Sequence, residues 1–200
     1  MQSPVLKVLI FCAVTAAIIL FCVVFGGYSS FYRSQNRIEE SKNILVESCR
    51  ERLALLPAVS DFLKKINMDT PSSVDQSIAK AESVLTAVFQ QKSPLEEQTT
   101  KDFEASQVHL TIEIKKILDG LKDVFDPESR KEFNSLKERV FKDQDDLYMA
   151  GDRYNYEVSY FNERVKSFPV SLIARLFGFH RITYYPFSEQ AFPPARKAFE

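Results

Sequence analysis

The stretch from Asp126 to Phe168 carries an apolar or aromatic residue at every seventh position. Asp126-Pro127 is a typical helix start, because an aspartate caps the first turn and proline is tolerated at the first helical position. No further proline occurs before Pro169. A strand cannot give a seven-residue period, so the stretch predicts one helix of roughly 60 Å at about 1.5 Å per residue. A helix of this length must pack against other long helices. The repeating positions are Phe133, Val140, Leu147, Tyr154, Phe161 and Phe168.

A second apolar row on the same helix is less regular. It passes through Leu136, is interrupted at Asp143, and resumes at Ala150 or Gly151. A shift of this kind is typical of a stutter, where the packing face rotates locally.

Three further amphipathic segments precede this helix. The first is expected to continue directly out of an apolar N-terminus, to kink at Pro57 and to end near Asn67. The second begins at Thr70-Pro71, and the third begins at Ser93-Pro94-Leu95-Glu96, where the sequence fits a capping box. The third helix is expected to stop at Phe125. Because short connections imply antiparallel neighbours, the predicted fold class is all-α: an antiparallel up-and-down four-helix bundle with an N-terminal transmembrane helix. If Ser93-Pro94 is a kink instead of a turn, the bundle has three helices.

The N-terminal segment is predicted to be a membrane anchor. Val8 to Phe25 contains only one polar residue, Thr15. With its flanks it is long enough to cross a ~30 Å hydrocarbon core. A cleaved signal peptide is the alternative, but its apolar region is usually only about 7–15 residues long. We therefore expect residues 1–29 to form an uncleaved single-pass anchor that contacts the membrane through residues 8–25.

Positive charges next to the anchor bear on its orientation. Lys7 and the α-amino group lie on one side, and Arg33, Arg37 and Lys42 lie on the other. The positive-inside rule then favours a cytoplasmic bulk domain.

The segment after the long helix is aromatic and rich in proline. In an up-and-down bundle the fourth helix returns towards the membrane, so Phe168 and the apolar residues between Val170 and Phe179 are expected near the bilayer. The favoured interpretation is that this segment caps the open end of the bundle. The other interpretation is a foot at the membrane interface, helped by basic residues at anionic headgroups. These basic residues are Arg175, His180 and Arg181. Residues 181–200 are treated as a separate C-terminal tail.

The residues that carry chemistry are sparse. His109 and His180 are the only histidines, and neither belongs to a zinc-binding pattern. The five glycines form no phosphate-binding loop, and the net charge of −1 gives no reason to expect nucleic acid. Cys12 and Cys22 lie in the apolar segment, which leaves Cys49 alone in the rest of the chain, so no intramolecular disulfide is expected. We expect no enzyme activity, no cofactor and no metal.

One run of residues resembles a known family, the LemA family. The resemblance is specific from about Leu147 to Phe187 and moderate from Arg50 to Lys64, where Arg52 and Leu56-Pro57 match the family pattern at the kink of the first helix. The residues that carry it are Ala150, Tyr154-Asn155, Val158, Phe161-Asn162, Val165, Phe168-Pro169, Leu172-Ile173-Ala174 and Gly178-Phe179.

The chain departs from the family pattern at four places. Asp126-Pro127 stands where the family usually has Tyr-Pro before the last helix. Gly151 stands where the family usually has arginine, and Phe161 replaces the second tyrosine. The long aromatic tail is not expected to belong to the common pattern. The resemblance marks residues 30–180 as the LemA-like helical bundle.

The shared motif has two interpretations. In the first, Tyr154, Val158, Phe161, Val165 and Phe168 form a core seam, while Asn155 and Asn162 hydrogen-bond to a neighbouring helix and fix its register. In the second, the asparagine flank recognises a partner. The candidate motif and interaction residues are Tyr154, Asn155, Val158, Phe161, Asn162, Phe168, Pro169, Gly178 and Phe179.

The resemblance implies a single-pass protein of the bacterial inner membrane with a helical bundle and no established enzymatic activity. The expected function is that of an envelope scaffold or protein-interaction module whose partners are other membrane or envelope proteins. A homo-oligomer is left open. The alternative is a ligand- or lipid-binding or sensing bundle at the membrane surface. It predicts a cavity among Leu147, Gly151, Tyr154 and the third helix.

Overall fold

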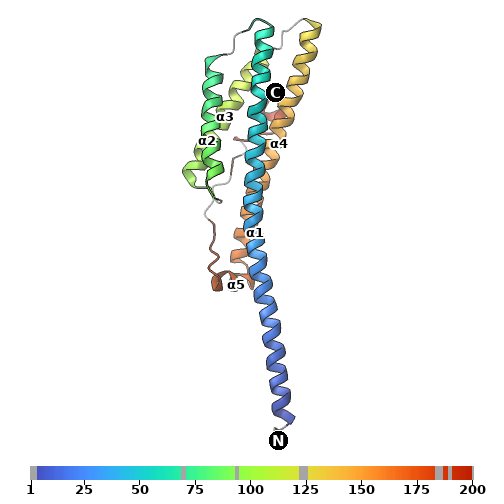
Figure 1. Ribbon diagram of the computed structural model, residues 1–200, viewed down its shortest axis with the longest axis vertical. Helices are drawn as coiled ribbons and strands as arrows, with labels where there is room; N and C mark the ends of the chain where they lie inside the picture. Colours follow the sequence, from blue (N-terminus) through green and yellow to red (C-terminus); the bar gives the residue numbers. More distant parts are fainter. Residues whose placement is uncertain are drawn as a thin grey trace. The chain divides into compact units, whose positions relative to one another are not determined.

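The computed structural model describes residues 4–68, 71–92, 95–121, 126–182, 187–188 and 191–199. Within these residues the protein is entirely helical and has no strand, which confirms the predicted all-α class (Figure 1). The helices are α1 (Pro4–Lys65), α2 (Ser72–Gln90), α3 (Glu97–Gly120), α4 (Pro127–Lys166), α5 (Val170–Leu176) and α6 (Ala195–Phe199).

The chain forms two compact units, and α1 and α4 contribute residues to both. We call Met1–Arg37 with Ser159–Ile182 the anchor unit. Ile38–Val158 with Thr183–Glu200 form the bundle unit. The anchor unit therefore includes α5 and the end of α4, and the bundle unit includes α6.

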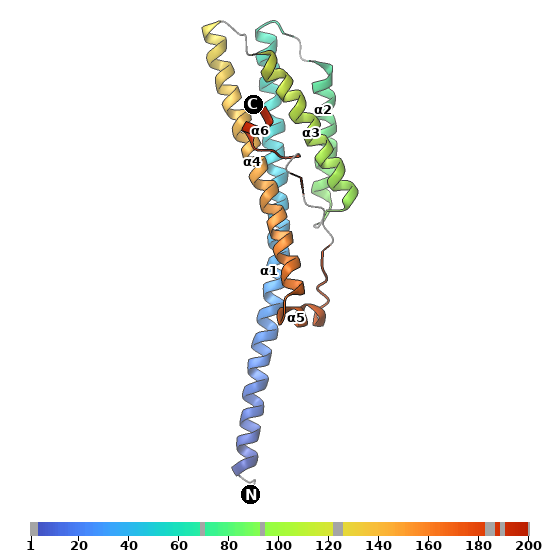
Figure 2. The same cartoon turned by 180° about the vertical axis from the view of Figure 1, so that it is seen from behind.

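The bundle unit contains parts or all of α1, α2, α3 and α4, in which successive helices run in opposite directions, together with the short α6 (Figure 2). Its core is lined by apolar side chains from all four, among them Leu45, Leu85, Phe103 and Leu147. Helix α2 ends at Gln90 and α3 begins at Glu97, so the chain turns between them and the four-helix prediction holds over the three-helix alternative. Ser93-Pro94 itself, like Thr70 at the predicted start of the second helix, lies outside the described residues.

The helix ends follow local chemistry, although not always at the predicted residue. The Asp126 Oδ2 atom accepts a hydrogen bond from the backbone N–H of Ser129 at 2.8 Å, which is the predicted cap of α4. Helix α1 continues through Pro57 as one helix and ends at Lys65. Asn67 takes the left-handed conformation, with φ 59°, and its N–H bonds to the carbonyl of Lys64 at 3.0 Å. An asparagine in this position closes a Schellman-type helix end.

Helix α3 is shorter than predicted at both ends. It begins after Glu96 and ends at Gly120, with Leu121 in a turn. Leu95, expected inside the helix, is instead buried in the connection before it. Most of the predicted stop before Phe125 lies outside the described residues.

The anchor unit contains the apolar half of α1. Within the described residues, α1 is the one helix long and apolar enough to cross a membrane, and the side chains of its apolar stretch are exposed. Helix α5 packs against α1 just after this stretch ends, at Gly27 and Tyr28 (Figure 1).

Candidate functional site

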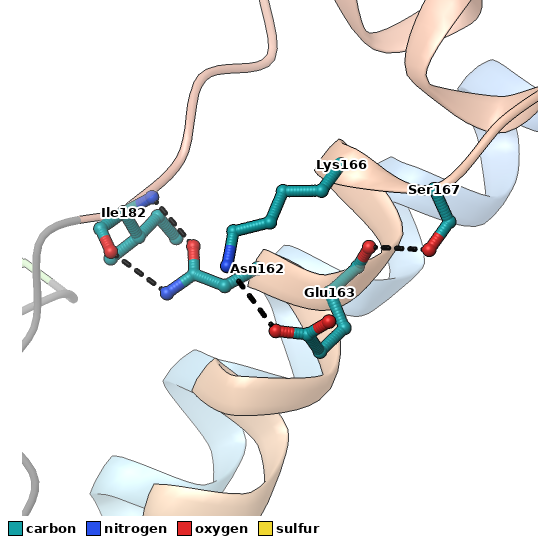
Figure 3. A network of polar contacts seen from close by, with 5 residues as sticks. All are labelled: Asn162, Glu163, Lys166, Ser167 and Ile182. Atoms are coloured by element: carbon teal, nitrogen blue, oxygen red, sulfur yellow. Dashed lines mark hydrogen bonds and ion pairs between the residues drawn. The ribbon is translucent and has the colours of Figure 1, made fainter.

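The second half of α4 holds the returning chain through two asparagine side chains. Asn155 Nδ2 donates to the carbonyl of Phe187, and Asn155 Oδ1 accepts from the N–H of Phe187, both at 3.0 Å. Asn162 pairs with Ile182 in the same way, with both distances 2.8 Å (Figure 3). Each side-chain amide therefore replaces a peptide group and satisfies one residue's donor and acceptor together. The predicted partner, a neighbouring helix, is wrong: both asparagines bond to the backbone of the chain that follows α5.

The surroundings of Asn162 are polar and exposed on one side. Figure 3 shows Asn162 pointing from α4 to Ile182, while Lys166 and Ser167 interact with Glu163. Ser167 Oγ donates to the Glu163 carbonyl at 2.8 Å, and Lys166 Nζ lies 3.3 Å from Glu163 Oε1. An exposed ion pair of this kind adds little stability. The hydrogen bonds between Asn162 and Ile182 are therefore what holds the chain after α5 to α4 at this point.

An aromatic cluster fills the bundle unit around Tyr154. The ring of Phe187 lies 5.4 Å from that of Tyr154, 5.6 Å from that of Phe103 and 5.1 Å from that of Phe192. Tyr154 Oη accepts a hydrogen bond from the buried Leu95 N–H at 3.2 Å, so its hydroxyl holds the connection before α3.

Gly151 explains how this cluster fits against α4. A Cβ atom at this position would lie 3.1 Å from Cδ2 of Phe192, which is closer than ordinary van der Waals contact. The position that carries arginine in the family pattern is therefore used here to receive a phenylalanine ring. The cavity predicted for a ligand near Gly151 is a wrong expectation, because Phe192 and Phe187 occupy the place. The space left there is about 40 Å³, well below the ~300 Å³ of a small-molecule site.

The C-terminal residues belong to the core of the bundle unit. Side chains of α4 hold their backbone: Gln144 Nε2 donates to the Pro193 carbonyl at 2.6 Å, and Asp145 Oδ1 accepts from the Ala195 N–H at 2.7 Å. The Phe199 ring lies 5.3 Å from that of Phe141. Residues 187–188 and 191–199 therefore pack beside the middle of α4, whereas the expectation placed the segment over the open end of the bundle. Tyr184, Tyr185 and Pro186 lie outside the described residues.

The other candidate residues do not form one site. Tyr154, Val158 and Phe161 are buried, as a core seam requires. Phe168 is 80 % exposed, so its place in the seam is wrong. The reason is that α4 ends at Lys166, and the chain leaves the helical register before Phe168. The remaining three follow the helix: Pro169 and Gly178 are exposed, and Phe179 stacks on Phe31 at 4.9 Å.

Arg52 is a buried cation that the sequence reasoning noticed only through the family resemblance. Its guanidinium donates to Gln107 Oε1 at 3.3 Å and to Thr111 Oγ1 at 2.8 Å. Burial lowers the pKa of Arg52 to about 10, against the opposing influence of Cys49 and Asp143. Burial also raises the pKa of the half-buried Asp143, the residue that interrupts the second row of α4. Gln107 and Thr111 lie one turn apart on the buried face of α3, a polar pair that could have indicated a polar partner.

An open groove lies between α1 and α4 in the bundle unit, with a volume of about 560 Å³. Its walls include the carboxylates of Glu51, Asp146 and Asp152. Met149 and Tyr156, which also line it, are 68 % and 63 % exposed. Sequence reasoning missed this groove, because these residues lie outside the two apolar rows that were followed.

The described residues hold no cluster of three or more His, Cys, Asp or Glu side chains able to bind a metal ion. A family model, that of the LemA family, matches residues 69–196, well over half of the chain. The match extends through nearly all of the C-terminal tail, so the expectation that the tail lies outside the common pattern is wrong. No curated protein and no solved structure matches the chain.

Proposed function

The chain belongs to the LemA family, and we propose that it is a non-enzymatic, membrane-anchored bundle that binds other membrane or envelope proteins. The observation that carries this proposal is the groove between α1 and α4. Its exposed Met149 and Tyr156 are large apolar or amphipathic side chains beside acidic walls. Methionine adapts to different partners, and tyrosine is common in protein interfaces.

The groove suits an amphipathic helix of a partner protein. A groove between two neighbouring helices, with apolar side chains at its edges, is a surface on which the apolar face of a partner helix can bind. Glu51, Asp146 and Asp152 favour a partner with lysine or arginine beside its apolar face. Arg153, which also lines the groove, interacts with Glu40 at 3.4 Å, and Lys142 pairs with Asp146 at 2.6 Å. Both pairs are exposed, and exposed ion pairs are weak enough for a charged partner to displace.

The anchor supports the membrane part of the proposal. The same helix, α1, carries the exposed apolar stretch and the groove residues Ile44, Ser48 and Glu51. An apolar stretch of this length, exposed in the isolated chain, is stabilised by lipid. We propose a bulk domain on the cytoplasmic side, because Arg33, Arg37 and Lys42 follow the stretch, whereas Lys7 and the α-amino group precede it.

Site-specific photocrosslinking tests the partner-binding role. A photoreactive residue replaces Met149 in the full chain, in native membranes, and the products are identified by mass spectrometry. The matched control carries the same residue at Lys80, an exposed position on α2. We expect a partner at position 149 that is absent at position 80 and is lost when Asp146→Lys and Asp152→Lys are combined, with unchanged thermal unfolding.

Three results would oppose the proposal. Identical products at both positions would mean non-specific capture. Products that persist after the charge reversal would mean that the acidic wall of the groove does not bind the partner. A product formed only with a second copy of the chain would replace the hetero-partner with a homo-oligomer.

A further inference from the structure

Helix α5 presents an apolar row that nothing in the anchor unit covers. Phe168 is 80 % exposed, Leu172 56 % and Leu176 68 %. Leu172 and Leu176 are four apart, so they lie on one face of α5. Phe168 lies in the turn between α4 and α5. Large apolar side chains this exposed in one contiguous row are typical of a protein or membrane contact.

The opposite face of α5 is fixed to α1. The Ile173 side chain lies directly on Gly27, where a Cβ atom would overlap the Ile173 Cδ1 methyl. The Phe177 ring lies 4.9 Å from that of Tyr28, and Ala174 is buried. Helix α5 therefore sits on α1 immediately after Phe25, where the apolar stretch ends.

Two further contacts hold the ends of this arrangement. Beyond α5, Phe179 stacks on Phe31 at 4.9 Å, and the backbone of Ile182 is held by Asn162. Before α5, the Arg164 guanidinium lies 4.9 Å from the centre of the Phe31 ring. Contacts before and after α5 therefore hold this helix against α1 and leave its apolar row exposed.

The charge around α5 is strongly positive. Residues 26–37 and 159–182 contain six arginine or lysine residues and a single acid, Glu163. The six are Arg33, Arg37, Arg164, Lys166, Arg175 and Arg181. A basic surface beside an apolar row matches an anionic lipid headgroup region, where the cations meet phosphate and the apolar side chains reach the acyl boundary.

We propose that α5 is an interfacial helix that places Phe168, Leu172 and Leu176 in the headgroup–acyl boundary of an anionic bilayer, beside the exit of α1. The occupant is lipid because the row is continuous with the apolar surface of α1 and is surrounded by cations. This inference rests on the proposed membrane crossing of α1. It goes beyond it by giving the anchor unit a second lipid contact.

The chain has no tryptophan, so a single introduced tryptophan reports its own surroundings. The test uses the full chain with Leu172→Trp, reconstituted in vesicles of phosphatidylcholine and phosphatidylglycerol that carry bromine at shallow or deep acyl positions. Ile18→Trp in the apolar stretch is the positive control, and Phe89→Trp, half exposed on α2, is the negative control. We expect Leu172→Trp to be quenched most by shallow bromines and to emit further to the blue than Phe89→Trp.

The outcomes separate the two proposals. Quenching of Ile18→Trp together with no quenching of Leu172→Trp would overturn the interfacial helix and leave the anchor intact. No quenching of either would overturn the membrane crossing as well. Quenching of Leu172→Trp by deep bromines alone would place α5 inside the hydrocarbon and also contradict the interfacial location. Blue-shifted Leu172→Trp emission without quenching would mean that another protein surface covers the row.

Discussion

The side-chain amide of Asn155 makes both hydrogen bonds of a peptide group with one residue, Phe187, which lies 32 positions later in the chain. Asn162 repeats the arrangement with Ile182. The two pairs belong to different compact units, so each unit has its own fixed point for the chain after α5. The shared Tyr-Asn and Phe-Asn motif therefore sets the register of the returning chain. It does not set the register between helices.

The first prediction concerns Asn155→Ala. This variant leaves the N–H and C=O of Phe187 without their partners, and loss of a partly buried pair costs about 1–3 kcal/mol. We expect a lower free energy of unfolding of that size, measured by urea unfolding of the full chain in detergent. Amide hydrogen exchange in residues 187–199 should also quicken. Asn155→Asp keeps the acceptor but loses the donor, so its free energy of unfolding should lie between those of the wild type and of Asn155→Ala. If neither stability nor exchange changed while partner crosslinking was lost, the motif would be a recognition surface.

The second prediction concerns Gly151 and Phe192. Gly151→Leu places a side chain where the Phe192 ring lies, and overpacking of this kind costs about 1–3 kcal/mol. Gly120→Leu is the matched control, because a Cβ atom there has nothing within 4 Å. Adding Phe192→Ala to Gly151→Leu should recover part of the loss, and a double-mutant cycle from thermal or urea unfolding measures it. Strict additivity of the two single changes would contradict direct packing between these residues.

The helices could be predicted because their signals are local and repeated. The Asp126-Pro127 start and the apolar positions from Phe133 to Phe161 each act within a few turns, and α4 follows them closely. The apolar stretch before Phe25 is recognised by length alone. The error at Phe168 came from extending the same period past Lys166, where the helix had already ended.

The long-range pairings could not be predicted in the same way. Asn155 matches any backbone N–H and C=O, so nothing in its own sequence neighbourhood selects Phe187. Gly151 could be interpreted only as part of a stutter, because the ring that fills its place, Phe192, is 41 positions away. A contact of this kind becomes visible only when the path of the chain after α5 is known.

The third prediction concerns Cys49, whose side chain is fully buried. Burial raises the pKa of its thiol from 9.0 to about 12, with Arg52 opposing. The unfolded chain releases this proton near pH 9 and the folded chain keeps it. The thiol's contribution to stability is therefore complete below pH 9 and is lost as pH rises towards 12. Above pH 9 we expect stability to fall as pH rises, until the loss of the Arg52 proton, whose pKa is about 10, begins to oppose this fall.

Unfolding at several pH values checks this dependence. Cys49→Ala should have a shallower loss of stability over the same window, and equal slopes would contradict the assignment. A membrane-impermeant maleimide should modify Cys49 only after unfolding in urea. Labelling of Cys49 in the folded chain therefore cannot report membrane orientation.

The fourth prediction uses two adjacent glycines of α1. Gly27→Leu occupies the place of the Ile173 side chain, whereas a Cβ atom at Gly26 has nothing within 4 Å. Both changes add the same side chain to neighbouring positions of one helix, so helix propensity and added apolar surface cancel in the comparison. We expect Gly27→Leu to lift α5 from α1 and Gly26→Leu to leave it seated. Hydrogen exchange of residues 170–182 should rise in the first variant alone. In the Leu172→Trp background, Gly27→Leu should also change the depth profile of quenching. Equal behaviour of the two variants would mean that the Ile173 contact does not hold α5, and that Phe177 and Phe179 seat it through Tyr28 and Phe31.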